Sequence, residues 1–288
     1  MILQHRTVGV GDQRFSAPCV GAVQYLNTRP LVHGLATAGV DVRYDLPSRL
    51  ADRLRCGDLD VALIPVIELF RGPRYEIVSD ACIGCRGPVM SVKVFYRTPP
   101  ERVATLAVDE GSRTSAALAR ILLAERHGVA PRVEVLPIGA GLADTSADAV
   151  LMIGDRGLGP AGGTSGAGSF QVVQDLGDEW CRWTGLPFVF AVWAARPHVD
   201  TATLGPLLSR ARDAGTANLA AIAAAEAARH GLTVPQCLGY LRDNLHFHLG
   251  PREREAIWLF RDKAATLGLA DPVPRAAATP PQPRQRVS

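Results

Sequence analysis

Residues 188–194, with the sequence FVFAVWA, are the stretch that decides how this chain of 288 residues is organised. An unbroken apolar run of this length is typical of a buried strand. A second strand is predicted at residues 90–96 (MSVKVFY), and the block of about 90 residues between the two has its own strand–helix–strand pattern. A chain that crosses into a second lobe and returns through two extended strands forms two lobes with a double hinge. Ligands commonly bind between such lobes.

On either side of this block, strands and helices follow one another along the chain. The predicted strands are residues 19–25, 42–46, 60–65, 105–108, 133–136 and 149–153. The predicted helices are residues 48–56 with Ser48 as N-cap, 66–70, 115–127, 203–230, 234–245 and 253–267, and another helix begins near Arg29. This order favours an α/β fold. We predict lobe 1 from residues 18–96 and 190–271, lobe 2 from residues 97–189, and flexible termini at residues 1–17 and 272–288.

The composition excludes several classes of partner. Hydrophobic residues make up 47% of the chain, which is typical of a globular protein. The formal net charge is +3, and the proline-rich residues 272–288 contain three arginines and no acid, so the rest is close to neutral. This argues against nucleic acid or an anionic membrane as the main partner. Apolar runs are too short for a signal peptide or membrane span, so we expect a cytoplasmic protein with six reduced cysteines.

Asn27 and Thr28 follow the first predicted strand and open a helix (QYLNTRPL, residues 24–31). Open α/β sheets place their ligands at the carboxyl ends of strands, which indicates a binding role for both side chains. On these residues alone, however, we favour the simpler interpretation that they only cap the helix.

Ser112, Thr114 and Ser115 precede the helix predicted at residues 115–127. Hydroxyls and free N–H groups at a helix N-terminus bind carboxylate or phosphate, although one hydroxyl could simply be a cap. Three hydroxyls exceed what a cap requires, so we favour anion binding. The glycine-rich residues 157–168 are expected to form a flexible loop, and without a following Gly-Lys-Ser/Thr they do not form a Walker-type phosphate loop.

Ser91 lies at the expected hinge, after a turn fixed by Gly87 and Pro88. Because no base is adjacent in sequence, we assign it hydrogen bonding before covalent catalysis. A buried strand serine without a role at the site is the slightly favoured interpretation from these residues alone. Cys82 and Cys85 form a CxxC without the context of a redox or zinc motif, and His246 and His248 have no third ligand at suitable spacing. We therefore predict no metal site.

Six segments, taken in order, resemble one known family, the chorismate dehydratases of the futalosine route to menaquinone. They are VGAVQYLNTRPL (20–31), GDLDVALIP (57–65), RGPVMSV (86–92), SRTS (112–115), LMIGD (151–155) and WTGLPFVFA (183–191). Their order and spacing hold from about residue 18 to residue 265, so the resemblance extends over most of the chain. The family tends to have an ordered helical segment where this chain has the glycine-rich residues 157–168.

The resemblance implies a two-lobed fold similar to periplasmic binding proteins of the second type. It also implies a carbon–oxygen lyase that removes water from chorismate to give 3-[(1-carboxyvinyl)oxy]benzoate, without a metal or organic cofactor. The residues it implies at the reacting centre are Asn27 and Ser91. The residues it implies for substrate binding are Thr28, Pro65, Gly87, Ser112, Thr114, Ser115 and Asp155.

The chemistry suits so sparse a site, because loss of water from the cyclohexadiene of chorismate gives an aromatic ring. We hypothesise that the substrate's own enolpyruvyl carboxylate takes the C3 proton, since no His, Glu or Lys lies in the Asn27 or Ser91 motifs. A non-catalytic protein or sensor that binds an aromatic carboxylate is the alternative. A sister enzyme that makes dihydroxynaphthoate relies on a histidine and is a less favoured one. The sequence leaves monomer and homodimer open.

Overall fold

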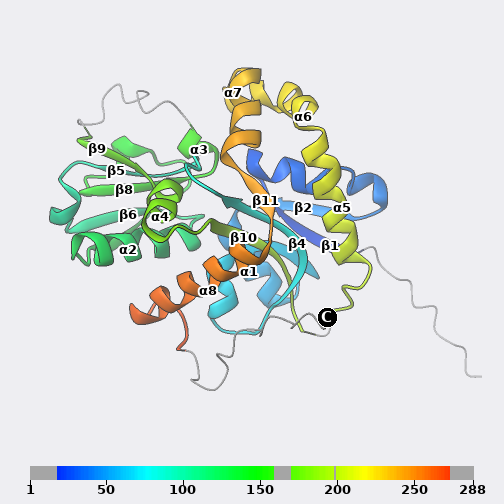
Figure 1. Ribbon diagram of the computed structural model, residues 1–288, viewed down its shortest axis with the longest axis horizontal. Helices are drawn as coiled ribbons and strands as arrows, with labels where there is room; N and C mark the ends of the chain where they lie inside the picture. The colour runs from blue at the N-terminus through cyan, green and yellow to red at the C-terminus, as the bar shows by residue number, and fades with distance from the viewer. Residues whose placement is uncertain (1–17, 159–169, 198, 273–288) are drawn as a thin grey trace, which may run out of the picture.

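The computed structural model describes residues 18–158, 170–197 and 199–272. Two sheets, one on each side of the molecule, form the cores of two lobes (Figure 1). The predicted two-lobed α/β architecture is confirmed. The predictions for the termini up to residue 17 and from residue 273, and for most of the loop at 157–168, lie outside the described residues.

The first sheet has six strands in the order β11-β4-β10-β3-β1-β2. Its strands are β1 (Cys19–Val23), β2 (Asp41–Asp45), β3 (Val61–Pro65), β4 (Glu76–Cys85), β10 (Phe188–Ala195) and β11 (His246–His248). β1 pairs in parallel with β2 and β3, while β10 runs antiparallel to β3 and β4. The apolar run at residues 188–194 therefore lies in a central strand.

The second sheet has five strands in the order β7-β6-β8-β5-β9. They are β5 (Val92–Tyr96), β6 (Thr105–Asp109), β7 (Arg132–Leu136), β8 (Ala149–Ile153) and β9 (Val172–Asp175). β6 pairs in parallel with β7 and β8, and β5 runs antiparallel to β8 and β9. Parallel strands in both sheets thus end toward the middle of the molecule.

The chain passes from one sheet to the other within residues 86–91 and returns within residues 185–187. The predicted lobe boundaries, at 96/97 and 189/190, lie a few residues beyond these changes of sheet. Alternating apolar residues identify β5 as a strand but cannot say which sheet it joins. At the return crossing Trp180 packs edge-on against Phe188 and donates its indole N–H to the Pro187 carbonyl at 2.9 Å.

Helices cover the sheets and supply the segments beside the cleft. The α-helices are α1 (Pro47–Cys56), α2 (Thr114–His127), α3 (Asp155–Leu158), α4 (Leu176–Thr184), α5 (Leu204–Ala217), α6 (Leu219–Glu226), α7 (Val234–Gly239) and α8 (Pro251–Thr266). Tighter 3-10 segments are η1 (Leu26–Val32), η2 (Ala36–Ala38), η3 (Val66–Phe70), η4 (Pro100–Arg102), η5 (Leu142–Asp144) and η6 (Ala227–His230), and η7 (Tyr240–Asn244) is a π-helix.

Several local predictions were wrong in physically informative ways. Ser48 is not an N-cap: Leu46 holds that position and Pro47, whose fixed φ suits the first turn, begins α1. The helix predicted across residues 203–230 is broken at Asn218 into α5 and α6. The segment after β1 is 3-10 rather than α-helical, with Pro30 inside it.

Candidate active site in the interlobe cleft

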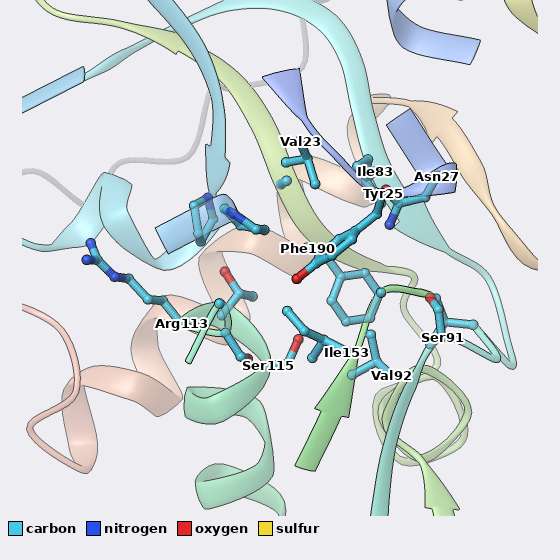
Figure 2. Close-up of a pocket in the computed structure, with 18 residues that line it drawn as sticks. Val23, Tyr25, Asn27, Ile83, Ser91, Val92, Arg113, Ser115, Ile153 and Phe190 are labelled. Atoms are coloured by element: carbon cyan, nitrogen blue, oxygen red, sulfur yellow. The ribbon is translucent and has the colours of Figure 1, made fainter. Parts of the chain in front are cut away.

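A cavity with an empty volume of about 500 Å³, its open mouth included, lies where parallel strands of both sheets end (Figure 2). β1 and β3 bring Tyr25, Asn27 and Pro65, and the segments after β6 and β8 bring residues 111–115 and Gly154. The first crossing segment adds Ser91, and β10 adds Phe190 with a neighbouring apolar residue. The lining is mainly apolar, with polar groups at a few places, as is typical of small-molecule sites.

Asn27 is held by its neighbours with its side chain at this cavity. It is 9% exposed, and the hydroxyl of the fully buried Thr28 donates to Asn27 Oδ1 at 3.3 Å. The hydroxyl of Tyr240, which opens the π-helix η7, lies near enough to the side chains of Ser91 and Asn27 for both to lower its pKa. Burial has the larger effect and raises the pKa of Tyr240, so the phenol stays protonated. Tyr240 is therefore a neighbour of both predicted catalytic residues, and sequence reasoning missed it.

Ser91 is placed by an unusual turn. Met90, immediately before it, has φ of 61°, a left-handed conformation that costs a residue with a side chain about 1–2 kcal/mol. Asp175, at the end of β9, holds this turn: its carboxylate accepts the N–H groups of Val89 at 3.1 Å and Met90 at 2.6 Å. Backbone strain that the surroundings enforce is common at functional sites. Ser91 itself is 1% exposed and lines the cavity.

The three predicted anion-binding hydroxyls lie together at the start of α2 and line the cavity. Ser112 Oγ accepts the N–H of Ala116 at 3.2 Å, and Thr114 Oγ1 accepts the N–H of Ile67, in the other lobe, at 3.3 Å. The N-cap position of α2 belongs to Arg113, and Ser112, one residue earlier, accepts an N–H of the first turn. Because each oxygen acts as acceptor in these bonds, its hydrogen is still available to a ligand. The first N–H groups of a helix also lack an intrahelical acceptor.

Arg113 is the charged residue among the described ones that line the cavity, and its guanidinium is already paired. It contacts Asp52 Oδ2 at 2.7 Å and Glu68 Oε2 at 3.1 Å, both in the first lobe. In Figure 2 its charged end points away from Ser91 and Phe190. A bound anion would therefore be held by neutral donors and the N-terminus of α2.

Of the four remaining residues predicted to bind substrate, one lines the cavity and three do not. Pro65 lines the cavity, whereas Thr28, Gly87 and Asp155 are not part of its lining. Asp155, which begins α3, instead reaches the first lobe: its Oδ1 accepts the N–H of Leu26 at 3.0 Å and its Oδ2 lies 3.1 Å from His230 Nδ1. Burial raises the pKa of Asp155, although both of these partners act to lower it. The direct substrate contacts assigned to all of these residues stay predictions.

Tyr25 and Gly154 form a close interlobe contact that the sequence did not reveal. Gly154 has φ of 60°, and a Cβ built there would lie 2.5 Å from Tyr25 Cδ2 and 2.6 Å from Cε2. No side chain larger than hydrogen fits between the ring and the end of β8. The ring of a first-lobe residue is therefore seated directly on the backbone of the second lobe.

Within the described residues no group of three or more His, Cys, Asp or Glu side chains is arranged to hold a metal ion. Cys82 and Cys85 lie in β4 as buried thiols. No helix among the described residues has the length and apolar character needed to cross a membrane.

Comparison with known proteins agrees with this architecture. The sequence model of a family described as "Menaquinone biosynthesis" matches residues 18–266. A curated chorismate dehydratase of Thermus thermophilus is 32% identical over 264 residues, which covers 87% of this chain and 95% of that protein.

Solved structures with low sequence identity share the fold. The protein AF1704 of Archaeoglobus fulgidus has a TM-score of 0.69 at 15% identity, covering 89% of this chain and 99% of that one. The alkanesulfonate-binding protein SsuA of Xanthomonas axonopodis pv. citri, solved with MOPS bound, has a TM-score of 0.64 at 13% identity, covering 89% and 95%. At these identities the likeness concerns the fold alone, which is that of periplasmic binding proteins.

Proposed function

This chain belongs to the menaquinone-biosynthesis family, and on that premise we propose that it is a chorismate dehydratase. It converts chorismate to 3-[(1-carboxyvinyl)oxy]benzoate and water in the cytoplasm. The observation that carries this proposal is the shape of the cleft. Asn27 and Ser91 lie at one side of the cavity and the hydroxyls of α2 at the other, so neutral donors face both parts of a dicarboxylate.

The proposed reaction is an elimination across C3 and C4 of the substrate ring. The enolpyruvyl carboxylate of the substrate takes the proton from C3, and the electron pair of that C–H bond forms the C3–C4 double bond. The C4–O bond breaks, and the departing hydroxide takes that same proton from the enolpyruvyl carboxylic acid to leave as water, which restores the carboxylate. Because the product ring is aromatic, the protein's main tasks are to position the substrate, exclude water and stabilise developing charge.

Asn27 and Ser91 are the side chains we assign to the reacting centre. The amide N–H₂ of Asn27 is available to a substrate oxygen, since Thr28 already donates to its Oδ1. The two residues orient the enolpyruvyl carboxylate or donate to the leaving hydroxyl. Tyr240 lies beside both of them as a protonated phenol. Neither an electron sink nor a Lewis acid is required by this route, so we propose that the enzyme acts without a cofactor.

The decisive experiment is incubation with chorismate, followed by loss of the diene absorbance and identification of the product by mass. Asn27→Ala and Ser91→Ala are each expected to abolish turnover while product binding, measured by calorimetry, persists. Asn218→Ala is the matched control, because Asn218 lies at the break between α5 and α6, outside the cavity lining.

The results separate the proposal from its alternative. Binding of chorismate without turnover by the unaltered protein would favour the non-catalytic binding protein. Full activity of Asn27→Ala would reject the role assigned to that residue.

A further inference from the structure

The hydroxyl of Tyr25 is a buried polar group without a partner. Tyr25 is 6% exposed and lines the cavity, and its Oη makes no hydrogen bond to any residue that the structure describes. In Figure 2 the ring extends beside Phe190 and carries its oxygen away from Asn27. The oxygen lies 3.0 Å from where a Cβ at Gly111 would stand, directly before the hydroxyls of α2. A buried donor left unpaired is costly, which indicates that a ligand supplies the acceptor.

The state of this phenol suits a donor. Burial first, and then the carboxylates of Asp109 and Asp155, raise the pKa of Tyr25, so the hydroxyl keeps its proton at neutral pH. Asp109 lies nearby but already has partners: it accepts the N–H of Gly111 at 2.9 Å and pairs with Arg156 at 2.9 Å. The Arg156 pair also offsets the negative charge of Asp109, which would otherwise repel an anion.

We propose that Tyr25 donates its phenolic hydrogen to the ring carboxylate of the substrate, beside the hydroxyls and N–H groups at the start of α2. This inference rests on the proposed function, because it takes the substrate to be a dicarboxylate. Tyr25 belongs to the first lobe and α2 to the second. The carboxylate is therefore gripped from both lobes.

The substrate has two carboxylates and the cavity has two ends, so placing one carboxylate also places the other. In the proposed mechanism the enolpyruvyl carboxylate acts at C3, beside Asn27 and Ser91. The carboxylate on C1 of the ring remains for the α2 end, to which the Tyr25 hydroxyl points. Tyr25 thereby helps to determine specificity for a substrate with a carboxylate at this position.

The test replaces Tyr25→Phe and compares two ligands by calorimetry: the product 3-[(1-carboxyvinyl)oxy]benzoate, and 2-phenoxyprop-2-enoate, which lacks the ring carboxylate. Loss of one hydrogen bond to a charged acceptor should weaken product binding about 10- to 100-fold. Binding of the analogue should stay unchanged. With chorismate, KM should rise by a similar factor while kcat changes less than about threefold, because the lost contact is remote from C3 and C4.

A thermal readout distinguishes this binding role from a structural one. Because the hydroxyl is unpartnered without ligand, Tyr25→Phe should leave the Tm of the free protein unchanged or slightly raised, and diminish only the rise in Tm on adding product. Tyr96→Phe is the control, since Tyr96 is also buried but lies outside the cavity lining.

Unchanged product affinity in Tyr25→Phe, or equal weakening for both ligands, would overturn the inference while leaving the dehydratase proposal intact. Failure of the unaltered protein to bind product and to consume chorismate would overturn both.

Discussion

Gly154→Ala tests whether the seating of Tyr25 on the second lobe is needed for catalysis. Alanine at φ of 60° costs about 1–2 kcal/mol in any context. The added methyl would also lie 2.5–2.7 Å from three atoms of the Tyr25 ring, an overlap that typically costs about 1–3 kcal/mol. The two costs can be separated, because Gly128, at the end of α2, has φ of 69° with nothing within 4 Å of its Cβ position. Gly128→Ala therefore pays only the backbone cost.

The overlap joins residues of different lobes, so the molecule can relieve it by holding the lobes apart. We expect urea unfolding of Gly154→Ala and Gly128→Ala to show a similar loss of stability, about 1–2 kcal/mol. The further 1–3 kcal/mol should fall on the closed arrangement and lower kcat/KM of Gly154→Ala by about 5- to 150-fold, with Gly128→Ala near the unaltered value. Equal kcat/KM in the two variants would refute this reasoning. So would a much larger loss of stability in Gly154→Ala at normal activity.

Two further outcomes are expected. Asp175→Ala should lower the free energy of unfolding by about 1–3 kcal/mol, because it removes the N-cap of α4 and the acceptor for the Met90 turn. It should also lower kcat, because Ser91 is displaced when the turn is lost. A normal kcat would show that the turn keeps its shape without Asp175. Burial, and then the Arg86 guanidinium, lower the pKa of His246 in the folded protein. Around the usual histidine pKa of about 6.5 the unfolded chain therefore binds more protons than the folded one, and the free energy of unfolding should fall as the pH is lowered from about 7.5 to 5.5. His246→Gln should flatten that slope, whereas His33→Gln, at an exposed position, should not.

Several residues singled out from the sequence line the cavity, but the sequence did not predict what they contact. Asn27, Ser91 and the α2 hydroxyls stood out because each follows or precedes a strand or helix end, and ends of parallel strands gather at one edge of a sheet. Asp155 follows a strand too, yet it contacts Leu26 and His230 across the cleft instead of lining the cavity. Strand-end position predicts that a residue lies near the cleft, but not what it faces.

Residues that lie far along the sequence from the other site residues had no local sequence pattern that marked them. Tyr240 lies more than 140 residues after Ser91 and in an element expected to be an ordinary helix, so nothing nearby marked it as a partner of the site. Asp175 was not singled out from the sequence, and its contacts with the Met90 turn became visible only when β9 was placed beside that turn.

Local patterns, namely apolar runs, turn residues and ordered motifs, were sufficient to determine an α/β chain with a double crossing, because burial and backbone preference act over a few residues. Only the tertiary structure decided that β5 joins the second sheet, that a phenol from the first lobe rests on Gly154 of the second, and that its hydroxyl is left for a ligand. Those contacts depend on the approach of surfaces far apart in the chain, and the distances that govern close packing and hydrogen bonding exist only once both lobes are in place.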